Sequence, residues 1–265
     1  MTTIYLLKAI TNMHVGSGDV NIDIIDNKVQ KDATTQLPII YSSSLKGALR
    51  EHFENKWDRN DKKIDYIFGK EGSSGGRYSF FEANILTLPQ RSNVKPYFNV
   101  TSPSIIEQLI KTLTIFNNED SFTPLIHSLK NFYEVIKDTK EAVIFEEFEN
   151  NNIYLEDIKA SYKKVEELPP IFNKNLAVLS DMNFMQIELP VIARNSLDEN
   201  GKSKTLWYEE IVPKESTFFF SLIKDKDFIK EFDEILENEI IQIGANRSIG
   251  YGFCTLKNIL RIKDE

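Results

Sequence analysis

The chain has 265 residues, of which 41% are hydrophobic, and a formal net charge of −8. This hydrophobic fraction, with 18 Phe and 10 Tyr, excludes an intrinsically disordered chain and predicts a packed core. Chains of this length can bury roughly 70–75% of their unfolded surface in one core, so we expect a single domain over residues 1–265.

The single cysteine, Cys254, excludes an internal disulfide, and the three histidines show no zinc-ligand spacing. No secretion signal is evident, and no apolar run approaches the ~20 residues that span a bilayer. The sequence therefore predicts a cytoplasmic protein with no membrane partner.

The negative charge is concentrated in two segments. Residues 134–167 and 225–239 each carry an excess of five acidic side chains, which leaves the rest of the chain at +2. Phosphate binding depends on Lys and Arg, so a uniformly acidic protein would bind nucleic acid poorly. With the charge separated in this way, a local groove can stay neutral or basic while acidic faces repel nonspecific nucleic acid.

The N-terminal part alternates strands and a helix. Residues 2–10 are β-branched and aromatic, which is typical of a strand, and the loop MHVGSGDVN follows. A helix is predicted over residues 41–57, where three serines are N-cap candidates. Residues 78–88 alternate well enough to predict a second strand.

Two insertions are expected next. A Ser-Pro start and regular apolar spacing predict a helix over residues 101–116, within a helical insertion at about 101–180. Residues 190–213 predict two strands around Asn200-Gly201, which is a strong hairpin signal.

The C-terminal part repeats the first pattern. A strand over residues 216–223, a helix over 225–240 capped by Asp225, a glycine loop over 243–253 and a final strand over 253–262 are predicted. The order strand, helix, strand, strand, helix, strand predicts an α+β fold. Its core would be ferredoxin-like (RRM-like), βαββαβ, with large insertions and a hairpin.

Several phosphate or metal motifs fail on spacing. Residues 201–203 resemble the end of a Walker loop, but Ser196 stands where its first glycine is required. Residues 19–23 imitate the start of a calcium loop, but its turn glycine and its glutamate are missing. Neither glycine loop completes a dinucleotide fingerprint.

The glycine loops and the start of the first helix are candidate phosphate-binding elements. Glycine lets backbone N–H groups approach phosphates, and a helix start offers unpaired N–H groups. Plain turns at the glycine loops, and a capped helix with solvated bases, stay open as alternatives. The candidate residues are Gly16, Ser17, Gly18, Ser42, Ser43, Ser44, Lys46 and Arg50.

A family resemblance runs from the first strand to the last. HVGSG, IIDNKVQK and LPIIYSSSLKGALRE resemble the signature of RAMP-superfamily CRISPR proteins. FFEANILTLPQRSNVKPYFNVTSPSIIEQL, LWYEEIVPKESTFFF and IQIGANRSIGYGF resemble the backbone subunits of type III-B (Cmr) complexes. The last loop departs from the family in its glycine pattern, so Arg247 is the expected source of its charge, and residues 117–180 match little.

The resemblance implies an RNA-holding role. Subunits of this family stack as repeated copies along a guide RNA (crRNA), beside other Cmr subunits. Each copy uses a hairpin as a thumb that splays the duplex of guide and target RNA. Here the hairpin at 190–213, with Arg194 and Trp207, would be that thumb; without the resemblance it would be an ordinary surface hairpin.

The resemblance also implies a metal-dependent endoribonuclease that cuts target RNA in antiviral defence. The match of IIDNKVQK makes Asp26 the catalytic candidate, either as a general base toward the 2′-OH of the RNA or as a ligand of a divalent metal such as Mg²⁺. His14 could orient a phosphate or transfer a proton, or it could only fix its loop.

The other acidic residues near these motifs have simpler expectations. Asp19, Asp23 and Asp32 are expected to be solvated. Glu209 and Glu210, beside the hairpin aromatics, could reach the site of a neighbouring copy, but a solvated rim is expected. Two other functions stay open: a noncatalytic crRNA-binding scaffold of the same superfamily, and a ferredoxin-like enzyme acting on a small molecule.

Overall fold

A computed structural model describes residues 1–18, 24–59, 61–70, 74–117, 120–149 and 152–262. Its central strands are β1 (Thr2–Ala9), β6 (Ala83–Arg91), β14 (Thr217–Ile223) and β16 (Phe253–Asn258). They lie in the order β16-β1-β14-β6, and each neighbouring pair is antiparallel. Three short strands extend these four: β2 (Ile39–Ile40), β5 (Ser79–Phe80) and β15 (Ile241–Gln242).

The two middle strands are buried on both faces. Most residues of β1 and β14 are buried, and Tyr5 pairs with Phe220 so that their rings stack at 5.4 Å. Such continuous apolar runs are typical of strands covered on both sides. The predicted strands over 2–10 and 216–223 are therefore confirmed within one or two residues.

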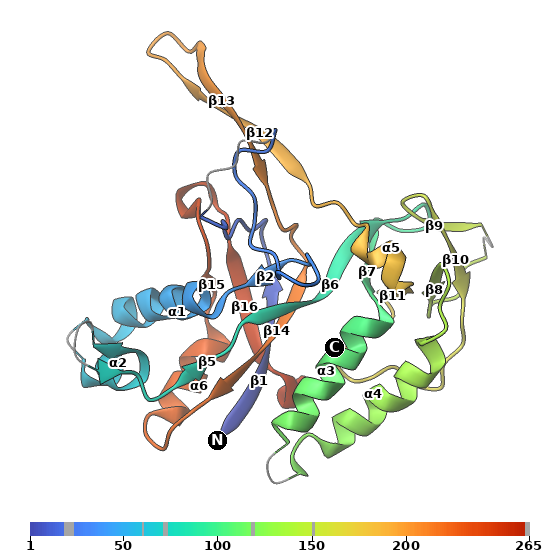
Figure 1. Cartoon of the computed structure of the whole chain (residues 1–265), viewed down its shortest axis with the longest axis horizontal. Coiled ribbons are helices and arrows are strands. Elements are labelled where there is room, and N and C mark those ends of the chain that lie inside the picture. The colour runs from blue at the N-terminus through green and yellow to red at the C-terminus, as the bar shows by residue number, and fades with distance from the viewer. Residues whose placement is uncertain (19–23, 60, 71–73, 118–119, 150–151, 263–265) are drawn as a thin grey trace.

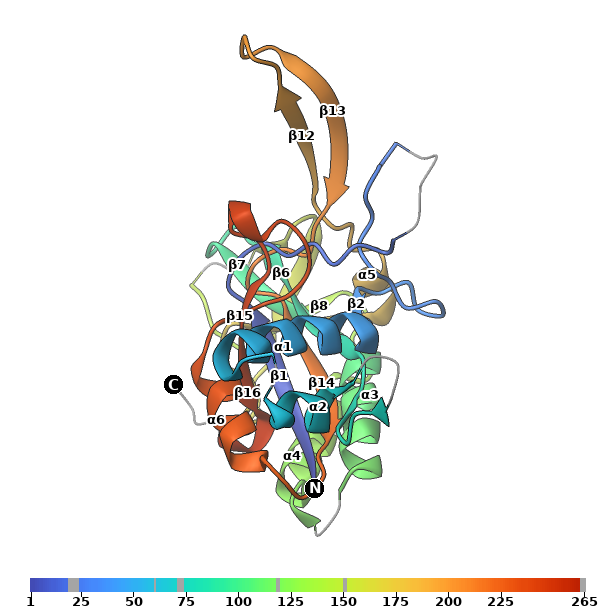
Figure 2. The ribbon, with the colours of Figure 1, turned by 90° about the vertical axis from the view of Figure 1, so that its left-hand side faces the viewer.

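Helices cover both sides of these strands. α1 (Ser42–Trp57), α2 (Lys62–Phe68) and α6 (Ile229–Asn238) lie on one side, and α3 (Pro103–Ile115) and α4 (Thr123–Ile136) lie on the other (Figures 1 and 2). Phe53 of α1 stacks on Phe232 of α6 at 4.5 Å with an interplanar angle of 3°, so aromatic contacts join these helices.

Two predicted helix starts need correction. The N-cap of α1 is Tyr41, without a side-chain hydrogen bond, so the three serines form the first turn instead of capping it. α6 begins at Ile229 after Phe228, which adopts a left-handed φ of 67°. Asp225 does not cap α6, because its carboxylate accepts hydrogen bonds from the Tyr66 hydroxyl and the Lys226 N–H.

The insertion after β6 is helical only in part. Helices α3 and α4 confirm its first half, but the second half adds strands to the main sheet, which continues β6-β7-β11-β8-β10-β9. A short α5 follows, and β3 pairs with β4 elsewhere. The bounds are β7 (Tyr97–Thr101), β8 (Ala142–Ile144), β9 (Ile153–Leu155), β10 (Ile158–Tyr162), β11 (Leu176–Leu179), α5 (Asp181–Met185), β3 (Gly69–Lys70) and β4 (Ser74–Gly75).

The predicted hairpin is present. β12 (Val191–Leu197) and β13 (Ser203–Glu210) pair antiparallel, and Gly201 in the turn has a φ of 76°, which favours glycine. The hairpin projects away from the rest of the molecule, and the segment after β1 passes beside its root (Figures 1 and 2). No helix of the described residues is long and apolar enough to span a membrane.

Candidate functional site

The candidate site lies at the root of the hairpin. There the long loop after β1, which contains the first glycine pair, contacts β13 and the residues that follow it. Met13 and Val212 exchange two backbone hydrogen bonds of 2.8 Å. On the other side, the Asn27 N–H donates to the Tyr208 carbonyl at 3.1 Å, and the Glu210 N–H donates to the Asn27 carbonyl at 2.9 Å. The root of the hairpin therefore forms backbone bonds to the long loop after β1 at two points, Met13 and Asn27.

Asp26 is exposed at this root. Its Oδ2 accepts a hydrogen bond of 2.8 Å from the Tyr208 N–H, and its Oδ1 has no hydrogen bond among the described residues. The backbone thus fixes one oxygen of an exposed carboxylate. Nowhere in the described part of the chain do three or more His, Cys, Asp or Glu side chains gather as metal ligands.

His14 lies inside the same root, not on its surface. It is 5% exposed, and its Nδ1 lies 2.7 Å from the Glu210 carbonyl, which can only accept, so Nδ1 carries the proton. Its Nε2 lies 3.9 Å from Glu209 Oε1. These contacts favour the interpretation that His14 fixes its loop.

Glu209 and Glu210 are buried, which contradicts the expected solvated rim. Their exposures are 4% and 5%. Glu209 accepts hydrogen bonds from Arg194 Nε and, at 2.8 Å, from Asn246 Nδ2. The Arg194 guanidinium also lies 4.6 Å from the ring centroid of Tyr251. Arg194 is therefore held by protein partners, and Trp207, opposite it in the hairpin register, is half-buried.

The two glycine loops pack against each other. The Ala245 N–H donates to the His14 carbonyl at 2.8 Å, and a Cβ at Gly244 would lie only 2.3 Å from that oxygen. In the first loop, the Ser17 N–H donates to the Lys28 carbonyl at 3.0 Å and Gly18 has a φ of 80°. Glycine is thus required where protein backbones approach each other. The sequence pattern could not distinguish this requirement from phosphate binding.

Gln30 ties the first loop to α1, and sequence reasoning missed it. Its Nε2 donates to the Gly16 carbonyl at 3.1 Å and to Ser44 Oγ at 2.8 Å, and its Oε1 accepts from the Tyr41 N–H at 2.8 Å. With 5% exposure, this amide brings the glycine loop beside the first turn of α1. Ser42, Ser43 and Gly16 are thereby placed in one region, as the anion-site hypothesis requires.

Lys46 and Arg50 on α1 have different environments. Lys46 Nζ lies 6.0 Å from the Phe80 ring centroid and forms no ion pair in the described part of the chain. Arg50 donates to Glu54 Oε1 at 2.7 Å and to the Gly69 carbonyl at 2.9 Å. Arg50 is therefore committed largely to the connection between α1 and α2, whereas Lys46 is not.

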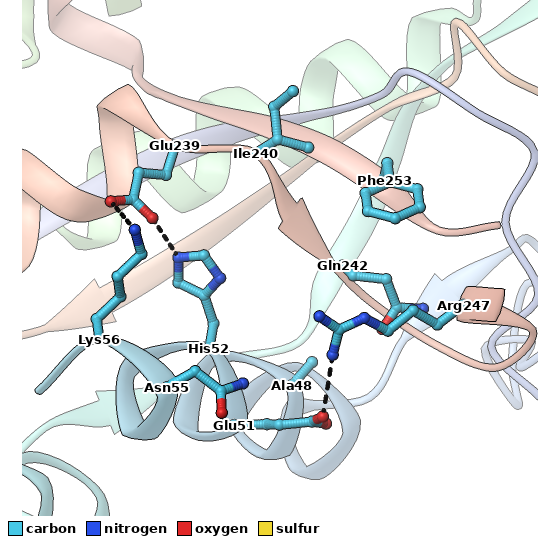
Figure 3. Close-up of a pocket in the computed structure, with 10 residues that line it drawn as sticks. All are labelled: Ala48, Glu51, His52, Asn55, Lys56, Glu239, Ile240, Gln242, Arg247 and Phe253. Carbon is cyan, nitrogen blue, oxygen red and sulfur yellow. Dashed lines mark hydrogen bonds and ion pairs between the residues drawn. The ribbon is translucent and has the colours of Figure 1, made fainter. Parts of the chain in front are cut away.

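Arg247 lies beside a cavity of about 290 Å³ between α1 and β15 (Figure 3). Its Nη1 lies 3.4 Å from Glu51 Oε1 in a pair whose side chains are both 62% exposed. Deeper in the cavity, His52 Nε2 lies 3.0 Å from Glu239, and burial lowers the pKa of His52. The charges of this cavity are mutually paired, and Arg247 is the most accessible of its bases.

The remaining aspartates of the loop fall into two groups. Asp32 accepts hydrogen bonds from the Thr35 N–H at 2.7 Å and the Thr34 N–H at 3.0 Å, and these bonds lower its pKa. It closes a local turn. Asp19 and Asp23 lie outside the described residues.

The chain is an α+β protein with a projecting β-hairpin. At the root of this hairpin, two glycine loops and the exposed Asp26 come together. A family model described as the RAMP superfamily matches residues 6–255, and the chain belongs to this superfamily.

Particular relatives are similar over nearly the whole length. The chain is 30% identical to the "CRISPR system Cmr endoribonuclease Cmr4" of Pyrococcus furiosus, covering 96% of this chain and 95% of that protein. It is 26% identical to the "CRISPR system CMR subunit Cmr4" of Saccharolobus solfataricus, with the same coverage.

Solved structures show the same fold. A type III-B Cmr-beta complex bound to cognate target RNA contains a chain with a TM-score of 0.85 and 24% identity, over 99% of this chain and 98% of that one. Oligomeric Cmr4 from Pyrococcus furiosus gives a TM-score of 0.73 and 23% identity, over 97% of this chain and 98% of that one.

Proposed function

We propose that this chain is a Cmr4-type backbone subunit of a type III-B CRISPR effector complex. Repeated copies stack along one crRNA beside other Cmr subunits, and each copy cleaves the paired target RNA. The 30% identity to a Cmr endoribonuclease over 96% of the chain supports this assignment. The observation that carries the cleavage is Asp26, an exposed carboxylate with one oxygen bound to the Tyr208 N–H.

The chemistry needs few protein groups, because the RNA supplies the nucleophile. A splayed nucleotide can place its 2′-OH in line with the adjacent phosphate. Attack there forms a 2′,3′-cyclic phosphate and breaks the bond to the 5′ oxygen of the next nucleotide, which takes a proton from water. Asp26 accepts the 2′-OH proton or holds a hydrated Mg²⁺. A single carboxylate fits Mg²⁺ because this ion usually keeps several waters, and when bound it supplies positive charge to the phosphate oxygens.

RNA holding is assigned to the first turn of α1 and to two basic side chains, of which Arg247 would exchange its exposed ion pair with Glu51 for a phosphate. The first turn of α1, with Ser42 and Ser43, offers N–H groups to a phosphate, and Lys46 and Arg247 offer positive charge. His14 fixes the loop between them. Trp207 and Arg194 shape the hairpin that separates guide from target.

We also infer that the core is ferredoxin-like, with α1 and α6 as its crossover helices. The strand order β16-β1-β14-β6 supports this, since it matches a split βαβ unit. A cytoplasmic location stays a prediction from the cysteine usage.

The test is cleavage by the assembled complex, loaded with a guide and given a labelled complementary RNA. We expect cuts that need the matching guide, appear with Mg²⁺ and disappear with EDTA. RNA binding without cuts would favour the noncatalytic scaffold. Cuts that persist in EDTA would overturn the metal requirement. A purified chain without bound RNA, judged by a low ratio of absorbance at 260 to 280 nm, would favour the small-molecule enzyme.

Replacing Lys46 by Gln should weaken RNA binding through lost phosphate contact. For each bound copy, the slope of log RNA affinity against log salt concentration should become less steep by about 0.7–1. This is the contribution of one neutralised phosphate. The measurement is RNA affinity between low and moderate salt. Arg50→Gln is the matched control: because Arg50 is bound to Glu54 and the Gly69 carbonyl, it should lower thermal stability and leave the slope unchanged. An unchanged slope in Lys46→Gln would remove Lys46 from the RNA site.

A further inference from the structure

We infer that Glu210 is a positioning residue for Asp26, so that the cleaving carboxylate is carried by the hairpin. This inference rests on the proposed function and deepens it. Glu210 is the last residue of β13, at the point where the hairpin enters the body of the protein.

The Asp26 segment lies along β13 like a further strand. Asn27 forms a parallel bridge with Glu209. Two backbone bonds flank that bridge, from the Asn27 N–H to the Tyr208 carbonyl and from the Glu210 N–H to the Asn27 carbonyl, at 3.1 and 2.9 Å. Asp26 itself accepts the Tyr208 N–H. The position of Asp26 is therefore set by the hairpin backbone.

The Glu210 side chain adds two contacts further along the Asp26 segment. Its Oε2 accepts a hydrogen bond from the Val29 N–H at 3.1 Å, and its Oε1 pairs with Lys31 Nζ at 2.7 Å. The Glu210 side chain is only 6% exposed and that of Lys31 is 32% exposed, so water screens this contact poorly. Together with its backbone N–H, Glu210 holds the segment at Asn27, Val29 and Lys31.

The neighbouring carboxylate shows that this role is specific. Glu209 is equally buried, but its oxygens receive Arg194 and Asn246, which lie on β12 and in the second glycine loop. Successive side chains of a strand point to opposite faces. Glu209 thus fixes the hairpin to the glycine loop, and Glu210 fixes the hairpin to the Asp26 segment.

Positioning of this kind affects the rate of a reaction more than binding. A displacement of about 1 Å at a reacting group can slow a reaction by about 100-fold. Loss of the Glu210 contacts leaves Asp26 its backbone bond to Tyr208, so a partial effect is expected. Guide and target RNA are held by other residues, so their affinity should not change.

The experiment compares Glu210→Ala, Glu210→Gln and Lys31→Ala in the full guide-loaded complex. At saturating target, Glu210→Ala should slow single-turnover cleavage by about 10-fold with RNA affinity unchanged. Glu210→Gln should show an intermediate loss, because its amide oxygen can still accept the Val29 N–H but its NH2 group cannot accept from Lys31. Lys31→Ala, which removes only the ion pair, should show an intermediate loss and covers the case that Glu210→Ala fails to assemble.

A second measurement does not depend on activity. Hydrogen–deuterium exchange should speed up in residues 24–31 of Glu210→Ala, while β1 and β14 keep their protection. Glu146→Ala is the control, because it removes another Lys–Glu pair, with Lys95 at 2.6 Å, outside the hairpin root. It should leave both the rate and the exchange of residues 24–31 unchanged.

The outcomes separate this inference from the proposed function. Asp26→Asn, measured in parallel, tests the function itself. If Asp26→Asn abolishes cutting while Glu210→Ala and Lys31→Ala cut at the normal rate, the positioning role is overturned and the function stands. If Glu210→Ala and Glu146→Ala slow cutting equally, the effect is general destabilisation and the inference also fails. If Asp26→Asn cuts normally, the catalytic role of Asp26 is lost.

Discussion

Asp26→Asn is expected to slow target RNA cleavage by at least ~100-fold, the contribution of a general acid or base group. An amide cannot accept the 2′-OH proton at neutral pH and brings no negative charge to a divalent metal. Asn nevertheless keeps an oxygen that can accept the Tyr208 N–H, so the segment should stay in place. The measurement is single-turnover cleavage of labelled target by the guide-loaded complex, with guide and target affinity determined separately.

Asp32→Asn is the matched control in the same loop. Asp32 is partly exposed, and its carboxylate closes a turn with Thr34 and Thr35. Its replacement should change the cleavage rate by less than about twofold, as for most surface changes outside a site. Normal cutting by Asp26→Asn, with RNA bound as before, would show that Asp26 is not the catalytic carboxylate.

The sequence predicted those elements whose signal is local. The apolar runs of β1 and β14 and the turn at Asn200-Gly201 each contain their structural cause within a few residues. The short strands after α4 do not. β8 has three residues and pairs parallel with β10 and antiparallel with β11, so its fold depends on partners far along the chain. A three-residue strand has no detectable period.

The candidate site shows the same difference between features with a local sequence signal and features that depend on distant residues. Asp26 became the catalytic candidate through a motif, and the structure shows that it is exposed. The burial of Glu210 was not predictable, because its partner Val29 lies 181 residues away in sequence. Arg194 was expected to be available to RNA, yet a buried carboxylate and a tyrosine ring hold it. Residue type indicates charge, but only the fold decides which charges are already paired.

A buried ion pair anchors α6 to the end of β14. The Lys224 side chain is 0% exposed and that of Asp233 is 8% exposed, with Nζ and Oδ1 2.5 Å apart. The Tyr5 hydroxyl completes the network, donating to Asp233 Oδ1 at 2.7 Å and accepting from Lys224 Nζ at 2.9 Å. Even with this partner, burial lowers the pKa of Lys224.

Asp233→Ala should destabilise the chain by about 3–5 kcal/mol, since it leaves a buried ammonium without its counter-charge. The measurement is the free energy of unfolding in urea. The loss should shrink as the pH rises. Asp233 raises the pKa of Lys224 against the effect of burial, so its removal lowers that folded pKa further, and the variant gains more stability than the native chain as the pH rises toward the unfolded pKa of about 10.4.

The double variant Lys224→Met/Asp233→Leu separates charge from packing. Replacing a buried ion pair by apolar side chains of similar volume is often neutral or stabilising, so it should recover most of the stability lost in Asp233→Ala. It should also show no rise in stability toward high pH, because the titrating amine is gone. A double variant as unstable as Asp233→Ala would instead mean that the hydrogen bonds of Tyr5 and Asp233, and not the unpaired charge, hold α6 against β14.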